Sequence, residues 1–170
     1  LINTESCTLY AIDAETGELL WSKWLAGYLY TTPSADDSSV FVVYNNGGHT
    51  ENRRENHVLA SFDLRTGETN WMQWVDYEAI ACPVVYKDEV HVSSQSGTYY
   101  VFDRKSGELK KLPENIQALS SPTITEEGIF LTVKANGGEK LIVLDRTSLK
   151  MKRQYKTDLD PSIISTSSGL

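Results

Sequence analysis

One short pattern recurs along the chain and constrains its fold more than any other feature. An alternating segment runs into an aspartate, a short polar run follows, and two of the copies close on a tryptophan. The steps between the aspartates are 50, 40 and 42 residues, and a period in this range indicates a solenoid, a propeller or an array of small units. The copies are AIDAETGELLW (residues 11–21), SFDLRTGETNW (61–71), VFDRKSGELKK (101–111) and VLDRTSLKMKR (143–153).

Each copy has the features of a tight β-hairpin. The alternation around Ser61 and Asp63 has the period of a strand, and the glycine that follows can take the positive φ that a hairpin turn needs. The aspartate can accept hydrogen bonds from the N–H groups of its own turn, so we expect turn capping rather than a ring of carboxylates that binds a cation. The predicted structural positions are Asp13, Thr16, Gly17, Trp21, Asp63, Thr66, Gly67, Trp71, Asp103, Ser106, Gly107 and Asp145.

A proline-led segment precedes three of the hairpins. Pro33, Pro83 and Pro122 each lead, seven residues later, to an apolar strand that begins at residue 40, 90 or 129. Each unit then holds four short antiparallel strands, which is the usual content of a β-propeller blade. The sequence therefore predicts an all-β propeller with four blades' worth of strands, at approximately residues 30–78, 79–117, 118–158, and 159–170 together with 1–29. The last of these blades is split between the termini, an arrangement that closes the ring and leaves no open sheet edge.

Composition excludes several classes of partner. The chain has 170 residues, 40% of them hydrophobic, and a net charge of -7, which disfavours nucleic acid and anionic membrane surfaces. No apolar run is long enough to span a membrane. The chain begins LINTESC, without an initiator methionine or a signal peptide, so we expect a processed or excised piece. Cys7 and Cys82 fit neither a disulfide framework nor a zinc site and are predicted to be buried packing residues.

The spacing A-x-D-x-x-T-G-x-x-x-W resembles the tryptophan docking motif of the quinoprotein-type (PQQ-like) β-propeller repeat family, and in its repeat the chain is similar to the BamB-like members. The resemblance implies that Trp21 and Trp71 pack against the neighbouring blade. Lys111 and Arg153 stand at the tryptophan position in the other copies, where we expect their alkyl stems to take over the packing. Family rings commonly have eight blades, so three interpretations stay open: a closed four-bladed ring, a homodimer that completes an eight-bladed ring, or half of a longer protein.

Catalytic chemistry is not indicated by the residues. The resemblance implies PQQ and calcium only if the chain is a fragment of a quinoprotein dehydrogenase, and it lacks the adjacent cysteines and the acidic cluster that such enzymes use. We therefore expect no cofactor and no metal. His49, His57 and His91 show no ligand spacing and are predicted to be solvated loop residues.

One loop departs from the repeat, because the segment 45–57 carries about ten extra residues. In the family's layout it shares a face with the connections between blades, and aromatic residues beside a charged loop are typical of a binding face. The alternative is that the aromatic residues pack between blades or around the channel mouth. The candidate face comprises Trp24, Tyr28, Tyr30, His49, Arg53, Arg54, Trp74 and Tyr77.

We therefore predict a non-catalytic propeller that acts as a protein-interaction or scaffold module with a protein partner. The alternatives are a fragment of a PQQ-dependent dehydrogenase and a ligand- or glycan-sensing propeller domain. The family resemblance implies an extracytoplasmic location, in the periplasm or the cell envelope.

Overall fold

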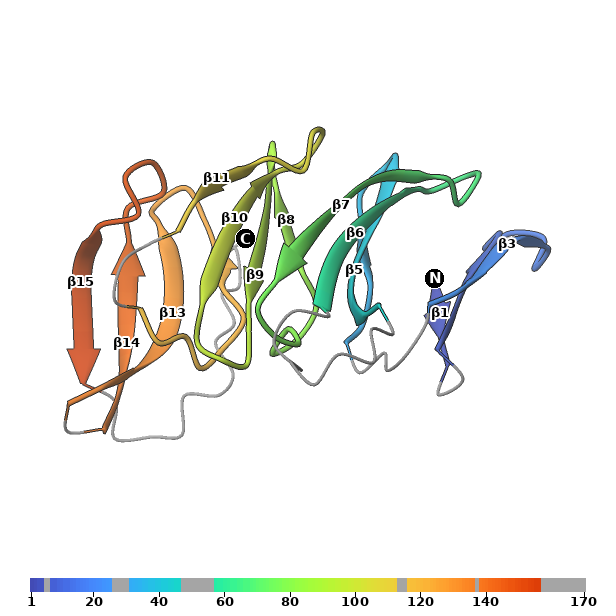
Figure 1. The fold of residues 1–170 in the computed structure, drawn as a ribbon. Coiled ribbons are helices and arrows are strands. Elements are labelled where there is room, and N and C mark those ends of the chain that lie inside the picture. The colour runs from blue at the N-terminus through green and yellow to red at the C-terminus, as the bar shows by residue number, and fades with distance from the viewer. Residues whose placement is uncertain (5–6, 26–30, 47–56, 113–115, 137, 157–170) are drawn as a thin grey trace.

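A computed structural model of the chain describes residues 1–4, 7–25, 31–46, 57–112, 116–136 and 138–156, and these form four antiparallel sheets. Consecutive strands pair in each sheet, as in a meander, and the sheets follow one another in a curved row with β1 and β15 at opposite ends (Figure 1). The described residues contain strands and turns and no helix. The all-β architecture and the four-stranded antiparallel units predicted from the sequence are confirmed.

The strands have the following bounds. The first sheet holds β1 (Ile2–Asn3), β2 (Thr8–Ile12) and β3 (Leu19–Trp24), and the second holds β4 (Ser34–Ala35), β5 (Ser39–Asn45), β6 (His57–Asp63) and β7 (Thr69–Val75). The third holds β8 (Val84–Tyr86), β9 (Glu89–Ser93), β10 (Tyr99–Asp103) and β11 (Leu109–Lys111), and the fourth holds β12 (Thr123–Ile124), β13 (Ile129–Ala135), β14 (Gly138–Leu144) and β15 (Met151–Lys156). The fourth strand of the first sheet, predicted from residues 159–170, lies outside the described residues.

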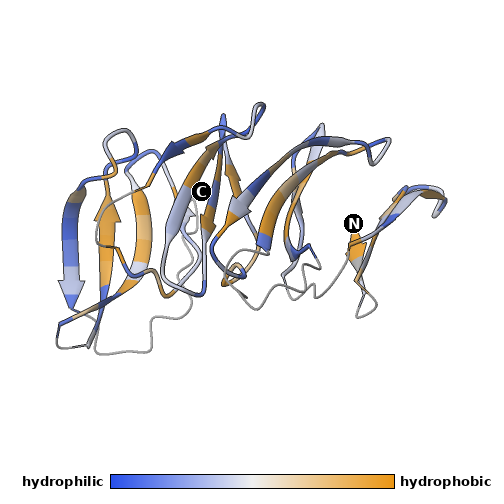
Figure 2. Ribbon diagram, in the orientation of Figure 1, coloured by the Kyte–Doolittle hydropathy of each residue, from blue (hydrophilic) through white to orange (hydrophobic). Residues whose placement is uncertain are grey.

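The hydrophobic core is divided among the spaces between neighbouring sheets. Strands β5 and β6 are buried on both faces, and strand alternation sends their residues to two different clusters. Val40, Val42 and Phe62 pack toward the first sheet, whereas Phe41 and Leu59 pack toward the third. A third cluster joins the third and fourth sheets. The apolar residues therefore follow the inner strands, as Figure 2 shows, and each sheet is stabilised mainly by its neighbours.

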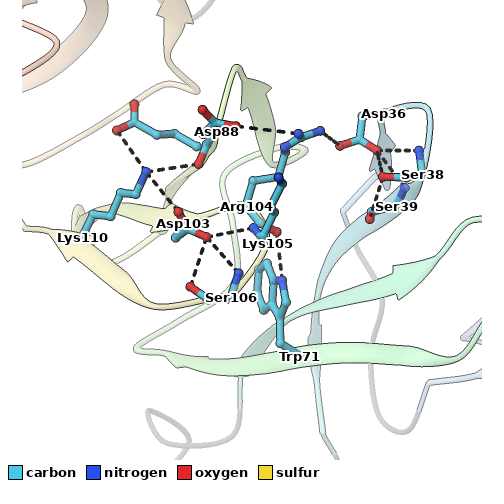
Figure 3. Close-up of polar contacts among 11 residues, drawn as sticks. Asp36, Ser38, Ser39, Trp71, Asp88, Asp103, Arg104, Lys105, Ser106 and Lys110 are labelled. Carbon is cyan, nitrogen blue, oxygen red and sulfur yellow. Dashed lines mark hydrogen bonds and ion pairs between the residues drawn. The ribbon is translucent and has the colours of Figure 1, made fainter.

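Two tryptophans join consecutive sheets in the same way. The indole Nε1 of Trp21 donates to the carbonyl of Leu64 at 2.9 Å, and that of Trp71 donates to the carbonyl of Arg104 at 3.0 Å (Figure 3). Each ring lies on the glycine of the next hairpin so closely that a Cβ added at Gly67 or Gly107 would come within 2.7 or 2.5 Å of the indole. The glycine is therefore required twice, for its φ near +72° and for its missing side chain.

The interface between the third and fourth sheets uses a different residue. Lys111 is exposed, and Leu149, at the glycine position of the fourth copy, is buried with a φ of +54°. The leucine side chain packs in the third cluster, on the same turn that carries the glycine at the other interfaces. The expectation that an alkyl stem replaces the indole is therefore wrong for Lys111, which is exposed beside the fourth sheet. The same expectation for Arg153 stays a prediction, because the strand predicted to follow β15 lies outside the described residues. The positive φ of Leu149 costs free energy, and burial of its side chain offsets that cost.

The repeated aspartates close their own turns. In each copy one carboxylate oxygen accepts two backbone N–H bonds, at 2.9 and 2.8 Å for Asp13 and at 3.0 and 2.8 Å for Asp103. Asp63 and Asp145 have the same pattern. These hydrogen bonds, the one from the Ser106 amide foremost, lower the pKa of Asp103 to about 2. The carboxylates therefore serve the turns.

Ion pairs add a second link between sheets. Arg104, next to the capping aspartate of the third sheet, pairs with Asp36 in the turn between β4 and β5, and its other terminal nitrogen lies 3.8 Å from Asp88 (Figure 3). Burial raises the pKa of Asp36, but hydrogen bonds from Ser38 and Arg104 outweigh it, so the net pKa is lowered. The carboxylate is therefore held ionised against the neighbouring sheet.

The predictions for His57, His91 and Cys82 need correction, and the one for His49 is not tested. His57 and His91 are buried, not solvated, because they lie in β6 and β9, and the His91 Nδ1 lies 2.7 Å from the Tyr99 hydroxyl. His49 lies outside the described residues. Cys7 is buried as predicted, whereas Cys82 is half-exposed because it lies in the connection before β8.

Candidate protein-interaction face

Three residues of the predicted face belong to the described part of the chain: Trp24, Trp74 and Tyr77. Trp24 ends β3 and Trp74 lies near the end of β7, so the two occupy equivalent places in successive sheets. The other five, Tyr28, Tyr30, His49, Arg53 and Arg54, lie outside the described residues, and the long loop is therefore not part of the site described below.

Trp24 and Trp74 point away from the core. Their side chains are 70% and 63% exposed, whereas Trp21 and Trp71, three positions earlier on the same strands, are 9% and 8% exposed. An odd number of steps along a strand places two residues on opposite faces, so each outer strand carries one buried and one exposed indole. Trp74 is exposed although described sheets lie on both sides of its own, which argues against packing between blades for this residue. Trp24 faces the side of the first sheet on which no further sheet is described, so packing between blades stays an alternative for it.

Further apolar side chains lie on the same strands at alternate positions, and the sequence analysis did not single them out. Leu20 on β3 is 51% exposed and Met72 on β7 is 39% exposed. Met72 is two residues from Trp74, and this spacing was sufficient to find it, whereas Leu20 is the extra residue of a β-bulge and does not follow the strand alternation. Trp74 and Met72 thus share one face of β7, and Leu20 adds an exposed apolar side chain to β3.

The chain segment that follows Trp74 is anchored. Ser96 and Thr98, in the turn between β9 and β10, donate hydrogen bonds to the Asp76 carboxylate, and the Asp76 amide donates to the Tyr100 hydroxyl at 3.2 Å. Burial raises the pKa of Asp76, yet the hydroxyl hydrogen bonds outweigh it and lower the net pKa. Burial also raises the pKa of Tyr100 to about 12, so it stays a neutral partner. The connection between the second and third sheets is therefore fixed in place.

Tyr77 is half-buried in this connection. Its ring stacks on the buried His57 with 5.6 Å between centroids, and the His57 Nε2 lies 3.6 Å from a carboxylate oxygen of Glu78. Tyr77 therefore contributes part of its ring to packing, unlike the two exposed tryptophans, and is a smaller element of the candidate face.

The described residues bring no three His, Cys, Asp or Glu side chains together in an arrangement that could hold a metal ion. The described residues form no helix that is long and apolar enough to cross a membrane. The chemistry that the geometry does offer is contact through large aromatic and aliphatic side chains on outer strands, which is typical of the anchor residues of protein interfaces.

Comparison with known proteins places the repeat. The sequence model of the family described as "Outer membrane protein assembly factor BamB" matches residues 1–110. A curated protein of that name from Francisella salina is 26% identical over 101 residues, covering 59% of this chain and 17% of that protein. The match of the family ends one residue before Lys111, the first position without a docking tryptophan.

Solved structures agree on the fold. The crystal structure of BamB from Moraxella catarrhalis aligns with a TM-score of 0.69 and 18% identity, covering 91% of this chain and 44% of that one. The computationally designed Ika8 protein aligns with a TM-score of 0.68 and 16% identity, covering 90% and 44%. The chain thus spans less than half the length of these relatives. The PQQ-like, BamB-like repeat predicted from the sequence is confirmed, whereas a homodimer gains no support from these comparisons.

Proposed function

Because this chain belongs to the family of the outer membrane protein assembly factor BamB, we propose that it is a non-catalytic β-propeller segment that binds partner proteins in outer membrane protein assembly. The observation that carries this proposal is the pair of exposed tryptophans, Trp24 and Trp74, at equivalent positions of two successive outer strands. A stable fold gains nothing from leaving an indole 70% exposed, whereas buried tryptophans dominate the energetics of many protein interfaces. The location that follows from this role is extracytoplasmic.

A scaffold role suits the way the repeat is built. The recurring residues are the ones that cap turns and dock sheets on each other, and no ligand set recurs with them. A row of rigid sheets presents side chains of its outer strands at fixed spacing, with little ordering cost on binding. We therefore assign recognition to the outer strands and stability to the buried faces.

The test is site-specific photo-crosslinking from Trp24 and Trp74 in a Gram-negative cell envelope. The photoreactive residue replaces one tryptophan at a time, and Thr69, exposed on the same β7 strand, serves as the matched control position. We expect cross-links from both tryptophan positions to proteins that assemble the outer membrane, and few from residue 69. Equal yields from all three positions contradict the proposed face.

A second measurement separates this proposal from the dehydrogenase alternative. Added PQQ and Ca²⁺ should leave the absorbance of the protein–cofactor mixture equal to the sum of its components, with no dye-linked alcohol oxidation. Turnover under these conditions would establish an enzyme and overturn the non-catalytic assignment. A glycan array addresses the sensing alternative, with saturable binding of a defined glycan as the contradicting result.

A further inference from the structure

The interface between the third and fourth sheets contains a groove of about 810 Å³. It lies where the docking tryptophan is missing, since Lys111 and Leu149, which stand at the tryptophan and glycine positions of the repeat, both line it. Among the described residues no docking indole crosses this interface, and Leu149 packs there instead. A volume in this range accommodates a ligand or a short peptide segment.

The floor of the groove is apolar and its rim is partly so. The side chains at the floor belong to the core between the two sheets, and Leu112 and Met151 at the rim are 48% and 57% exposed. The buried residues that line it are Val133, Ile142, Leu144 and Leu149, with Ile116 half-buried beside them. Apolar side chains of a partner would gain burial along this floor.

Four lysines are among the residues that line the groove: Lys111, Lys134, Lys140 and Lys150. Lys134 follows Val133 on β13, so its side chain lies on the other face of that strand, and the other three are nearer the apolar floor. No aspartate or glutamate is among the described residues that line the groove, although the whole chain carries a net charge of -7. The groove is therefore a local cationic surface on an acidic protein, and it favours an anionic occupant.

These lysines also lack the ion pairs that several other lysines make. Lys87 lies 2.7 Å from Glu126 and Lys110 lies 3.3 Å from Asp103, whereas none of the four groove lysines is in an ion pair within the described ranges. Lys140 is 3.5 Å from the Gln154 amide oxygen, which carries no charge. Lys134 is opposite Glu139 in the β13–β14 register, without reaching ion-pair distance. Among the described residues, no carboxylate therefore pairs with the positive charge at the groove.

We propose that this groove binds an extended segment of a partner protein in which acidic residues alternate with large apolar ones. Apolar side chains of the segment lie on the floor, and its carboxylates meet the lysines at the rim. A single fatty-acid carboxylate would engage one lysine and leave the others unpaired, so several separate cations fit a segment with several carboxylates better. This inference rests on the proposed function in taking the occupant to be a protein, and it states the chemistry of that protein.

The test uses a short fluorescein-labelled peptide in which glutamate alternates with leucine and phenylalanine, titrated with the 170-residue chain by fluorescence anisotropy. The groove variant is the double substitution Lys140→Glu and Lys150→Glu. Its matched control is Lys105→Glu with Arg65→Glu, which makes the same change of net charge at two exposed cations that do not line the groove. Thermal unfolding of each variant reports its folding.

The groove variant should bind the peptide roughly tenfold or more weakly than the control, and affinity should fall with added salt. A peptide with lysine in place of glutamate should not bind. Equal loss in groove variant and control, or equal binding of both peptides, overturns the proposal. Binding of palmitate at the groove without binding of the acidic peptide also overturns it, in favour of a small amphiphile. The crosslinking from Trp24 and Trp74 is a separate measurement. If the peptide does not bind the groove but the cross-links form, the proposed function stands and only the groove proposal fails. If the cross-links do not form, the proposed face fails whatever the peptide does.

Discussion

Replacement of Trp71 by alanine tests the central claim about how the sheets hold together. The side chain is 8% exposed and its indole lies on Gly107 of the next sheet, in the cluster that joins the second and third sheets. The substitution removes this packing and the 3.0 Å hydrogen bond to the Arg104 carbonyl. Since the glycine beneath has no side chain to move into the space, the cavity should collapse only partly.

The expected cost follows from these contacts. Truncation of a buried tryptophan costs about 3–5 kcal/mol, of which the hydrogen bond accounts for about 1 kcal/mol. With a urea m-value of about 2 kcal/mol/M, a loss of about 4 kcal/mol moves the unfolding midpoint down by about 2 M. Urea unfolding followed by far-UV circular dichroism measures this shift.

The matched control is Trp74→Ala on the same strand. Trp74 is 63% exposed, so its removal should change the free energy of unfolding by about 0.5 kcal/mol or less. The reasoning is refuted if the two variants lose similar stability, or if Trp71→Ala costs less than about 1 kcal/mol. In either case the docking tryptophan does not carry the interface.

Three further predictions follow from the turns and the altered interface. Lys111→Trp alone should not stabilise the fold, because the Leu149 side chain occupies the place that the indole would take. Combined with Leu149→Gly, it should show a favourable coupling of about 1–3 kcal/mol in a double-mutant cycle measured by urea unfolding. Additivity of the two substitutions within about 0.5 kcal/mol contradicts this prediction. Gly107→Ala should destabilise more than Gly17→Ala, since both glycines have φ near +72° but only the first meets an indole, and equal losses of melting temperature would show that contact to be unimportant. Hydrogen bonds, foremost from the Ser106 amide of its own turn and also from Lys110, lower the pKa of Asp103 from 3.8 to about 2. The unfolded chain therefore binds more protons in this window, and stability falls as the pH drops from about 4 to about 2. Asp103→Asn should flatten this fall in melting temperature, and an unchanged slope counts against the capping role.

Local patterns were enough to predict the architecture. The aspartate and glycine of each hairpin are determined by interactions within about four residues, namely the amides that need an acceptor and the φ that needs a glycine. The alternation in β5 and β6 and the spacing of Trp21 and Trp71 follow from the strand period in the same way. Such short-range constraints are visible in a sequence because each is satisfied by neighbours along the chain.

Burial at particular positions was not predictable in this way. His57 and His91 are polar residues without a ligand pattern, and their burial depends on which sheet covers their strand. The exposure of Trp24 and Trp74 has the same origin, because a tryptophan on an outer strand packs only if a neighbour reaches it. For the candidate face, the sequence indicated the residue types and the strands, and the structure decided which side chains are free.

The repeat by itself determined that this chain forms stacked antiparallel sheets, since turn capping, strand period and the glycine beneath each tryptophan are local requirements written in consecutive residues. Tertiary structure alone decided where the stacking is imperfect. The lysines of the groove come from strands and turns of two different sheets. Leu149 packs where an indole contact lies at the other interfaces, and this role is visible only once the third and fourth sheets are placed together. Contacts between sheets depend on residues distant in the sequence, so their gaps and charges emerge only once the sheets are side by side.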